Sequence, residues 1–196
     1  MSEPRPPLFY DLASSSWGPE EYQAIHRVLD SGQLTLGPWV REFEQDFARK
    51  FDIKHALMVS SGSAANLVGA PPLFYKKELP LQRGDEVIVP AISWATTYYP
   101  LQQYGLRLRF IDVDLTTLNM DVSQLEQALT PRTRMVVAVS ILGNPCALET
   151  LRAFCGSHGL YLFEDNCESM GATFQGRPCG TFGDINTFSS FFSHHI

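Results

Sequence analysis

Short apolar segments alternate with helical segments along most of this sequence, and that alternation constrains its fold more than any other feature. The apolar segments are DEVIVPA at 85–91, LRLRFIDVD at 106–114, TRMVVAVSIL at 133–142 and LYLFEDN at 160–166. Between the last three lie the helical patterns DVSQLEQAL at 121–129 and ALETLRAFCGSHG at 147–159. Several strands are apolar on both faces, which is typical of a buried parallel sheet. The sequence therefore predicts a three-layer α/β/α fold with a mostly parallel sheet.

Two amphipathic helices are expected before this alternating region. The stretch WGPEEYQAIHRVLDSG at 17–32 opens with a proline and two acids, as first turns do, and closes at a glycine. The stretch GPWVREFEQDFARKF at 37–51 places Trp39, Phe43 and Phe47 four residues apart, on one face of a helix.

After these helices the amphipathic pattern gives way to short apolar segments and turns. ALMV at 56–59 predicts a buried strand, and SSGSAAN at 60–66 predicts the tight turn and helix start that come after it. Pro71 and Pro72 should end that helix early, because a proline in a helix interior removes a backbone donor.

Composition narrows the classes of protein and partner. With 196 residues, 44% of them hydrophobic, the chain is long enough for one domain with a sizeable core. A net charge of −6 argues against nucleic acid and anionic membrane as partners. No signal peptide is visible, and no run approaches the roughly 20 apolar residues that span a bilayer.

The cysteines bear on the compartment. Cys146, Cys155, Cys167 and Cys179 are widely spaced and form no CxxC pair. Free buried or half-buried thiols are the prediction, with disulfides or a metal as alternatives, and the cytoplasm is the expected location.

Three features fall where strands are expected to end, which is where such sheets bind ligands. Gly62 permits a tight turn, and Ser63 with the amides of Ser63 and Ala64 could hold a phosphate at a helix N-terminus. An ordinary strand-to-helix turn is the alternative. The stretch is neither a Walker loop nor GxGxxG, and it lacks the GxSxG of serine hydrolases.

The other two features are Asp165, at the end of LYLFED, and Trp94, in PAISWATT. A buried carboxylate needs a cationic partner, and a ligand with a protonated ring nitrogen would supply one. The alternative for Asp165 is a helix-capping or salt-bridged acid, and its neighbour Glu164 is expected to be structural. An indole at a strand exit could cover a flat cofactor, whereas a core tryptophan is the alternative.

In their order along the chain, VSSGSAAN, GDEVIVPAISWATT, EDNCESMGA and GTFGDINTFSSFFSHHI resemble the DegT/DnrJ/EryC1/StrS family of sugar aminotransferases. The resemblance runs from about Gly32 to Ile196. It implies an aspartate-aminotransferase-like large domain that binds pyridoxal 5′-phosphate or pyridoxamine 5′-phosphate and acts on a nucleotide-linked keto-sugar.

The resemblance also implies a set of cofactor contacts. Trp94 would stack on the ring, Asp165 would meet the pyridine nitrogen, and Glu168 would lie near the ring oxygen. The phosphate contacts would be Gly62, Ser63, Ala64 and Ser189.

The histidines at the end of SSFFSHHI are the main departure from the family pattern. His194 falls where family members carry the lysine that holds the cofactor covalently, and His195 falls on the following asparagine. SHHI, together with LGNP at 142–145, resembles the branch of the family that removes the C3 hydroxyl of a 4-keto-6-deoxy sugar nucleotide. His194 would then be the catalytic base. A metal site and two merely structural histidines are the other interpretations of the pair.

Three functions remain open from the sequence. The first is a 3-dehydratase of deoxysugar or surface polysaccharide biosynthesis, with glutamate or an iron–sulfur cluster beyond Ile196 supporting turnover. The second is an aminotransferase of the same family, and the third is a non-catalytic or regulatory homologue that binds cofactor.

The expected organisation is a leader and helix at 1–31 followed by the first part of the large domain at 32–196. The rest of that domain and a small C-terminal domain would be missing. By resemblance, the complete protein would be a homodimer and this segment alone would be inactive.

Overall fold

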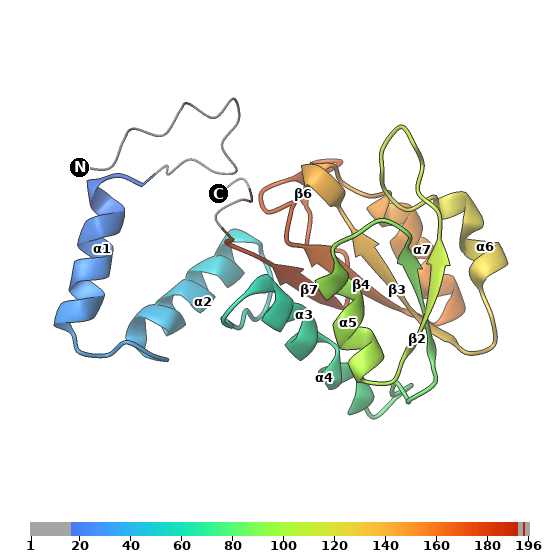
Figure 1. The fold of residues 1–196 in the computed structure, drawn as a ribbon, viewed down its shortest axis with the longest axis horizontal. Helices are drawn as coiled ribbons and strands as arrows, with labels where there is room; N and C mark the ends of the chain where they lie inside the picture. The colour runs from blue at the N-terminus through green and yellow to red at the C-terminus, as the bar shows by residue number, and fades with distance from the viewer. Residues whose placement is uncertain (1–16, 192–193, 195–196) are drawn as a thin grey trace, which may run out of the picture.

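The structure, a computed structural model, describes residues 17–191 and residue 194. In this part of the chain a five-stranded sheet runs through the centre, with helices packed on it (Figure 1). Its strands are β1 (Glu86–Pro90), β2 (Arg107–Ile111), β3 (Thr133–Val139), β4 (Tyr161–Asn166) and β7 (Ile185–Phe188). Their order is β2-β1-β3-β4-β7, and every neighbouring pair is parallel. The predicted parallel α/β sheet is confirmed.

Helices cover both faces of this sheet. Before the sheet come α1 (Pro19–Asp30), α2 (Pro38–Lys50), α3 (Gly62–Gly69) and α4 (Pro71–Phe74). The later helices are α5 (Ala95–Gln103), α6 (Leu125–Ala128) and α7 (Leu148–His158), with short 3-10 turns η1 (Val122–Gln124) and η2 (Ile141–Gly143). A small antiparallel hairpin, β5 (Thr173–Phe174) with β6 (Arg177–Pro178), lies outside the main sheet.

The apolar side chains of the central strands divide between two cores. Ile88 and Leu162 point to one face, where α6 and α7 bury leucines against them. Val87 and Val137 point to the other face, which α4 and α5 cover with Leu73 and Leu101. Because burying a side chain of this size contributes about 1.5–3 kcal/mol, the two cores account for the continuous apolar runs in the sequence. The three-layer arrangement follows from them.

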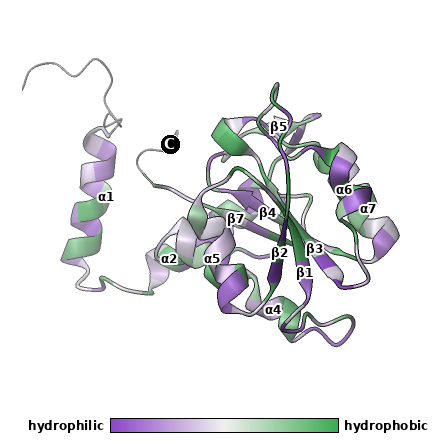
Figure 2. Ribbon diagram, turned by 45° about the vertical axis from the view of Figure 1, so that its right-hand side comes forward, coloured by the Kyte–Doolittle hydropathy of each residue, from purple (hydrophilic) through white to green (hydrophobic). Residues whose placement is uncertain are grey.

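The first two helices lie beside the sheet rather than on it. Figure 1 shows α1 standing away from the sheet, and neither α1 nor α2, both described in full, contains a buried residue. Coloured by hydropathy, α1 carries both hydrophobic and hydrophilic bands (Figure 2). The ring of Phe47 on α2 meets the ring of Phe188 on β7, with centroids 5.1 Å apart. This aromatic contact joins α2 to the edge of the sheet.

One predicted strand is wrong. The segment ALMV at 56–59 belongs to no strand, and its Leu57 and Met58 side chains are exposed. The Met58 N–H donates to Glu44 Oε1 on α2 (N···O 2.8 Å), so the segment is held by a side chain rather than by a strand. Pro71 does end α3 as expected, because a new short helix begins at that residue.

Two further expectations concern cysteines and membranes. All four cysteines lie within the described residues and are free thiols, with Cys167 half-buried and the other three buried.

Within the described part of the chain, no helix has both the length and the apolar character required to cross a membrane. Residues 1–16 of the predicted leader, and His195, lie outside the described residues.

Leu162 provides a test of the core. Its side chain is fully buried between β4 and α7, so Leu162→Ala should lower the free energy of unfolding by about 2–5 kcal/mol. Leu115, whose side chain is 86% exposed, is the matched control, and Leu115→Ala should change the free energy by less than about 0.5 kcal/mol. Urea denaturation of the purified variants measures both values, and equal losses would contradict the assignment of the core.

Candidate active site

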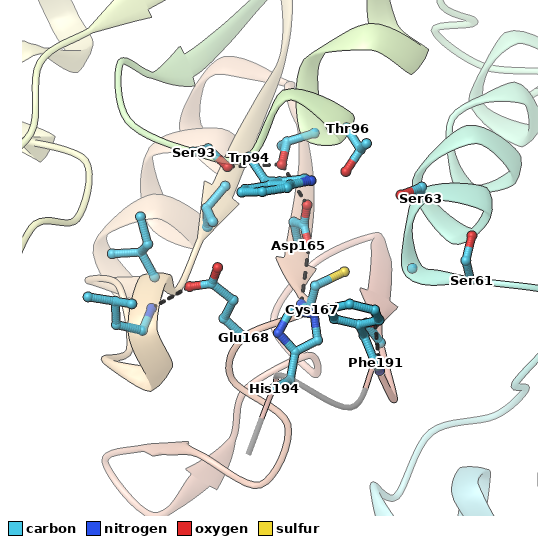
Figure 3. A pocket seen from close by; sticks show the side chains of 16 residues that line it. Ser61, Ser63, Ser93, Trp94, Thr96, Asp165, Cys167, Glu168, Phe191 and His194 are labelled. Atoms are coloured by element: carbon cyan, nitrogen blue, oxygen red, sulfur yellow. Dashed lines mark hydrogen bonds between the residues drawn. The ribbon is translucent and has the colours of Figure 1, made fainter. Parts of the chain in front are cut away.

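A pocket of about 460 Å³ opens at the carboxyl end of the sheet. Its walls come from the start of α3, the start of α5, the β3–η2 connection, the end of β4 and the segment after β7. Figure 3 shows side chains from these separate segments converging on one space. Parallel strands end on the same edge of the sheet, which explains why segments so distant in sequence meet here.

The start of α3 forms one wall. Ser61 is the N-cap in an extended conformation, and its Oγ accepts the N–H of Ala64 (N···O 3.1 Å). Gly62 and Ser63 line the pocket, whereas Ala64 does not appear among the lining residues and its amide is already bound to Ser61. Of the three residues predicted here, two therefore face the cavity.

Gly62 is in contact with the opposite wall. A Cβ atom at this position would lie 2.7 Å from the Cβ of Ser189 and 2.8 Å from the Sγ of Cys167. Such distances are shorter than van der Waals contact, so no larger side chain fits without movement of α3 or its neighbours. Glycine is required here for close approach rather than for an unusual φ angle.

Asp165 lies at the floor of the pocket, where β4 ends, and its side chain is 4% exposed. Its Oδ2 accepts hydrogen bonds from Asn66 Nδ2 and Thr97 Oγ1, both at 2.8 Å, and its Oδ1 accepts the N–H of Cys167 at 3.1 Å. Within the described residues no basic side chain forms a salt bridge with it. Neutral donors therefore orient the carboxylate, and the salt-bridge alternative has no partner in the part of the chain that the structure describes.

Glu164, the preceding residue, faces the opposite side of β4. Its carboxylate is buried and accepts the backbone N–H groups of Gly180, Phe182 and Gly183. This acid holds the turn between the hairpin and β7, which confirms the structural role expected for it. Because side chains alternate along a strand, these two consecutive acids point to opposite faces and make different contacts.

Trp94 is the N-cap residue of α5, and its side chain is 74% exposed at the pocket. A core tryptophan, the alternative left open by the sequence, is therefore excluded. Figure 3 shows the indole on the same side of the cavity as Ser93 and Thr96, above Asp165.

The Glu168 side chain accepts a hydrogen bond from the strained backbone of Leu142. Leu142 has a left-handed conformation (φ 53°, ψ 26°), and its N–H donates to Glu168 Oε2 (N···O 2.7 Å). Because a side chain larger than glycine rarely adopts this conformation, the hydrogen bond helps to hold it. The Leu142 side chain stays exposed at the pocket, so Glu168 connects the pocket floor to an apolar residue at its opening.

The segment after β7 completes the site. Ser189 is buried, and its Oγ accepts the N–H of Phe191 (N···O 3.1 Å). The N–H of His194 donates to the Phe191 carbonyl oxygen (2.9 Å), and the two rings meet edge to face with centroids 5.5 Å apart. His194 lines the pocket together with Phe191 (Figure 3). All four lysines of the chain fall within the described residues, and none lines the pocket.

A family model for the DegT/DnrJ/EryC1/StrS aminotransferases matches residues 16–196. The chain belongs to that family.

Individual relatives are similar along nearly the whole chain. The GDP-4-keto-6-deoxy-D-mannose 3-dehydratase of Escherichia coli O55:H7 is 53% identical over 187 residues, which cover 95% of this chain and 48% of that protein. A solved structure of the E. coli 3-dehydratase with bound hydrated PLP superposes with a TM-score of 0.91 at 53% identity, covering 95% of this chain and 48% of the other. A solved GDP-4-keto-6-deoxymannose-3-dehydratase, described as having a trapped PLP-glutamate geminal diamine, gives a TM-score of 0.91 at 52% identity with the same coverage. The chain therefore spans about half the length of these relatives.

Several pocket residues of this family member were not singled out by the sequence. Ser61, Ser93, Thr97 and Phe191 line the pocket, and Asn66 contacts Asp165 beneath it. Ser61 could have been found, because a serine directly before a helix is a strong N-cap signal. Asn66 and Thr97 carry no such signal, since both contact Asp165, which lies 99 and 68 residues away from them in sequence.

Replacing Gly62 tests the close packing of α3. Gly62→Ala should destabilise the protein by about 1–3 kcal/mol, because the new methyl group would overlap Ser189 and Cys167. Gly156, in the interior of α7 with nothing within 4 Å of its Cβ position, is the control. Gly156→Ala should range from neutral to about 1 kcal/mol more stable. Chemical denaturation measures both, and a neutral Gly62→Ala would contradict the tight contact.

Cys167 offers a test of pocket electrostatics. Burial first, and then the negative charge of Asp165 and a hydrogen bond to it, raise the pKa of the Cys167 thiol. The thiol should therefore remain protonated at neutral pH, and only the thiolate reacts with alkylating agents. Iodoacetamide at neutral pH should modify Cys167 far more slowly than the same cysteine in the unfolded chain, as followed by peptide mass spectrometry. Rapid modification of the folded protein would contradict this environment.

Proposed function

We propose that this chain is the cofactor-binding part of a pyridoxal-phosphate-dependent enzyme that removes the C3 hydroxyl of a nucleotide-linked 4-keto-6-deoxy sugar. The observation that carries the proposal is the presence of His194, and of no lysine from the described residues, among the pocket-lining side chains. The 3-dehydratases named above support it, because they are similar over nearly the whole chain.

The residues present fit such a cofactor. A buried carboxylate with no cationic partner among the described residues, Asp165, is suited to a protonated ring nitrogen. The exposed indole of Trp94 offers a flat apolar surface at the same cavity, and the N-terminus of α3 offers amide donors to a phosphate. In our proposal the phosphate is held by Gly62, Ser63, Ala64 and Ser189. The Ala64 amide would then be shared with Ser61 or released from it.

Glu168 would serve the ring oxygen from the pocket floor, while its other oxygen keeps the Leu142 turn in place. When bound, pyridoxal or pyridoxamine phosphate supplies an electron sink for bond cleavage at the neighbouring carbons. Asp165 then holds the ring nitrogen proton, because its negative charge favours the protonated ring.

His194 has the proton-transfer role in this proposal. The imidazole would remove a proton from C4′ of the aminated cofactor and, once protonated, would return that proton to the C3 hydroxyl as it leaves as water. A lysine amine at this place would instead join the cofactor covalently. An imidazole forms no stable bond of this kind, so the cofactor would be held by noncovalent contacts alone and the imidazole would stay available for proton transfer.

The wider context is proposed with the same support. Glutamate would be the amino donor, as the glutamate adduct in one solved relative suggests. The complete protein would be a cytoplasmic homodimer in deoxysugar or surface polysaccharide biosynthesis. Residues 1–31 would form a leader and helix, and residues 32–196 the first part of the large domain.

Borohydride reduction tests the central claim. The protein encoded by its complete gene, loaded with pyridoxal phosphate and reduced, should show no lysine peptide carrying the cofactor in mass spectrometry. His194→Lys should introduce such a peptide, and His194→Asn should lower the rate of sugar dehydration by about 10²–10⁴-fold, the size of a general acid–base contribution.

The alternatives give different results. A cofactor-modified lysine in the unmutated protein, with amino-sugar formation, would show that the aminotransferase is correct. Absence of any cofactor absorbance after loading would favour a non-catalytic homologue.

A further inference from the structure

Asn66 is buried beneath the pocket and uses both ends of its amide. It lies on α3, and its side chain is 3% exposed. Its Nδ2 donates to Asp165 Oδ2 at 2.8 Å and to the carbonyl oxygen of Thr96 at 3.3 Å. Its Oδ1 accepts a hydrogen bond from Thr187 Oγ1 at 2.6 Å. A single side chain therefore links α3 to β4, α5 and β7.

Thr187 holds the oxygen end of the Asn66 amide. It is the β7 residue paired with Asp165 on the neighbouring strand, and its side chain is also buried. Asp165 Oδ2 and the Thr96 carbonyl oxygen can only accept, so the NH₂ group must face them, and the Thr187 hydroxyl, which also lies 3.3 Å from the Glu164 carbonyl oxygen, donates to Asn66 Oδ1. The flipped amide would place Oδ1 against Asp165 Oδ2, and two acceptors at that distance repel each other.

Thr97 completes the arrangement around the same oxygen. Its hydroxyl donates to Asp165 Oδ2 at 2.8 Å, and the hydroxyl of Ser93 lies 2.9 Å from it. Because the Thr97 hydrogen is directed at Asp165, Ser93 is the donor between the two hydroxyl groups. Oδ2 is thus fixed by two neutral donors, whereas Oδ1 accepts the Cys167 amide.

We propose that Asn66 is a positioning residue for Asp165, held at its other end by Thr187, and that it fixes the carboxylate for the ring nitrogen of the cofactor. This inference rests on the proposed function, because it assigns a ligand to Asp165. A carboxylate already held in place needs no reorientation when the ligand binds, which favours affinity. Asn66 contributes through Asp165 and is not itself among the pocket-lining residues.

A purely structural tie between α3 and β7 would have the same contacts, so the test needs a reading at the cofactor itself. Asn66→Leu keeps a similar shape and removes both the donor and the acceptor. Thr187→Val removes only the hydroxyl that holds the oxygen end of the amide. Thr133→Val is the matched control, because Thr133 is a buried strand threonine on β3 whose hydroxyl accepts the Thr130 N–H at the opposite end of the sheet.

The experiment uses the protein encoded by its complete gene. Affinity for pyridoxal phosphate is measured by absorbance titration, and the ring-nitrogen ionisation of the bound cofactor is followed by its spectrum as a function of pH. Asn66→Leu should weaken affinity about tenfold, the value of one hydrogen bond to a charged group, and should move the ring ionisation to lower pH. Thr187→Val should show a smaller change in the same direction, and Thr133→Val should show neither.

The outcomes separate the two proposals. If the unmutated protein binds no cofactor, the proposed function fails and the positioning role fails with it. If it binds cofactor, and Asn66→Leu lowers thermal stability while affinity and ring ionisation stay unchanged, Asn66 is structural and only this inference is overturned. Should Asn66→Leu not fold, Thr187→Val decides by the same two measurements.

Discussion

Burial of the sheet on both faces is the constraint on which the rest of this structure depends. Strands that are apolar all round must be covered by helices on each side, and the connections between parallel strands must then cross over. Every crossover begins at the carboxyl end of a strand, so the polar residues that follow β1, β3, β4 and β7 collect at one edge. The pocket is a consequence of this topology, and its chemistry depends on the residues found in those few connections.

On strand β4, one acid stabilises a loop outside the pocket and the next faces the pocket. Its consecutive acids are both buried, yet Glu164 accepts three backbone amides, whereas Asp165 accepts two side chains and one backbone amide. The first arrangement fixes a loop, and the second leaves a carboxylate facing the cavity. One strand therefore carries two buried carboxylates. Hydrogen bonds from a loop satisfy that of Glu164, whereas that of Asp165 still faces the cavity.

The sequence predicted the layers and the parallel sheet because periodicity and two-sided apolar runs report burial directly. It failed at ALMV, where an apolar run without a strand partner remains exposed. Asp165 and Trp94 could be picked out because the first lies at the end of a recognisable strand and the second follows one. Asn66, Thr97 and Thr187 could not, since a polar side chain on a helix or strand has no local signature when its partner lies far along the chain. The sequence also could not predict that the Trp94 side chain is exposed, because a strand exit suits a buried indole equally well.

The contact at Gly62 has a consequence for how this site can change. Since the backbone of α3 rests directly on Ser189 and Cys167, the start of this helix, the end of β4 and the segment after β7 are in close contact at the cavity. A mutation that enlarges the side chain at Gly62 should therefore displace both opposing segments. Substitutions that reshape the cavity without disturbing that contact are therefore expected at the exposed Leu142.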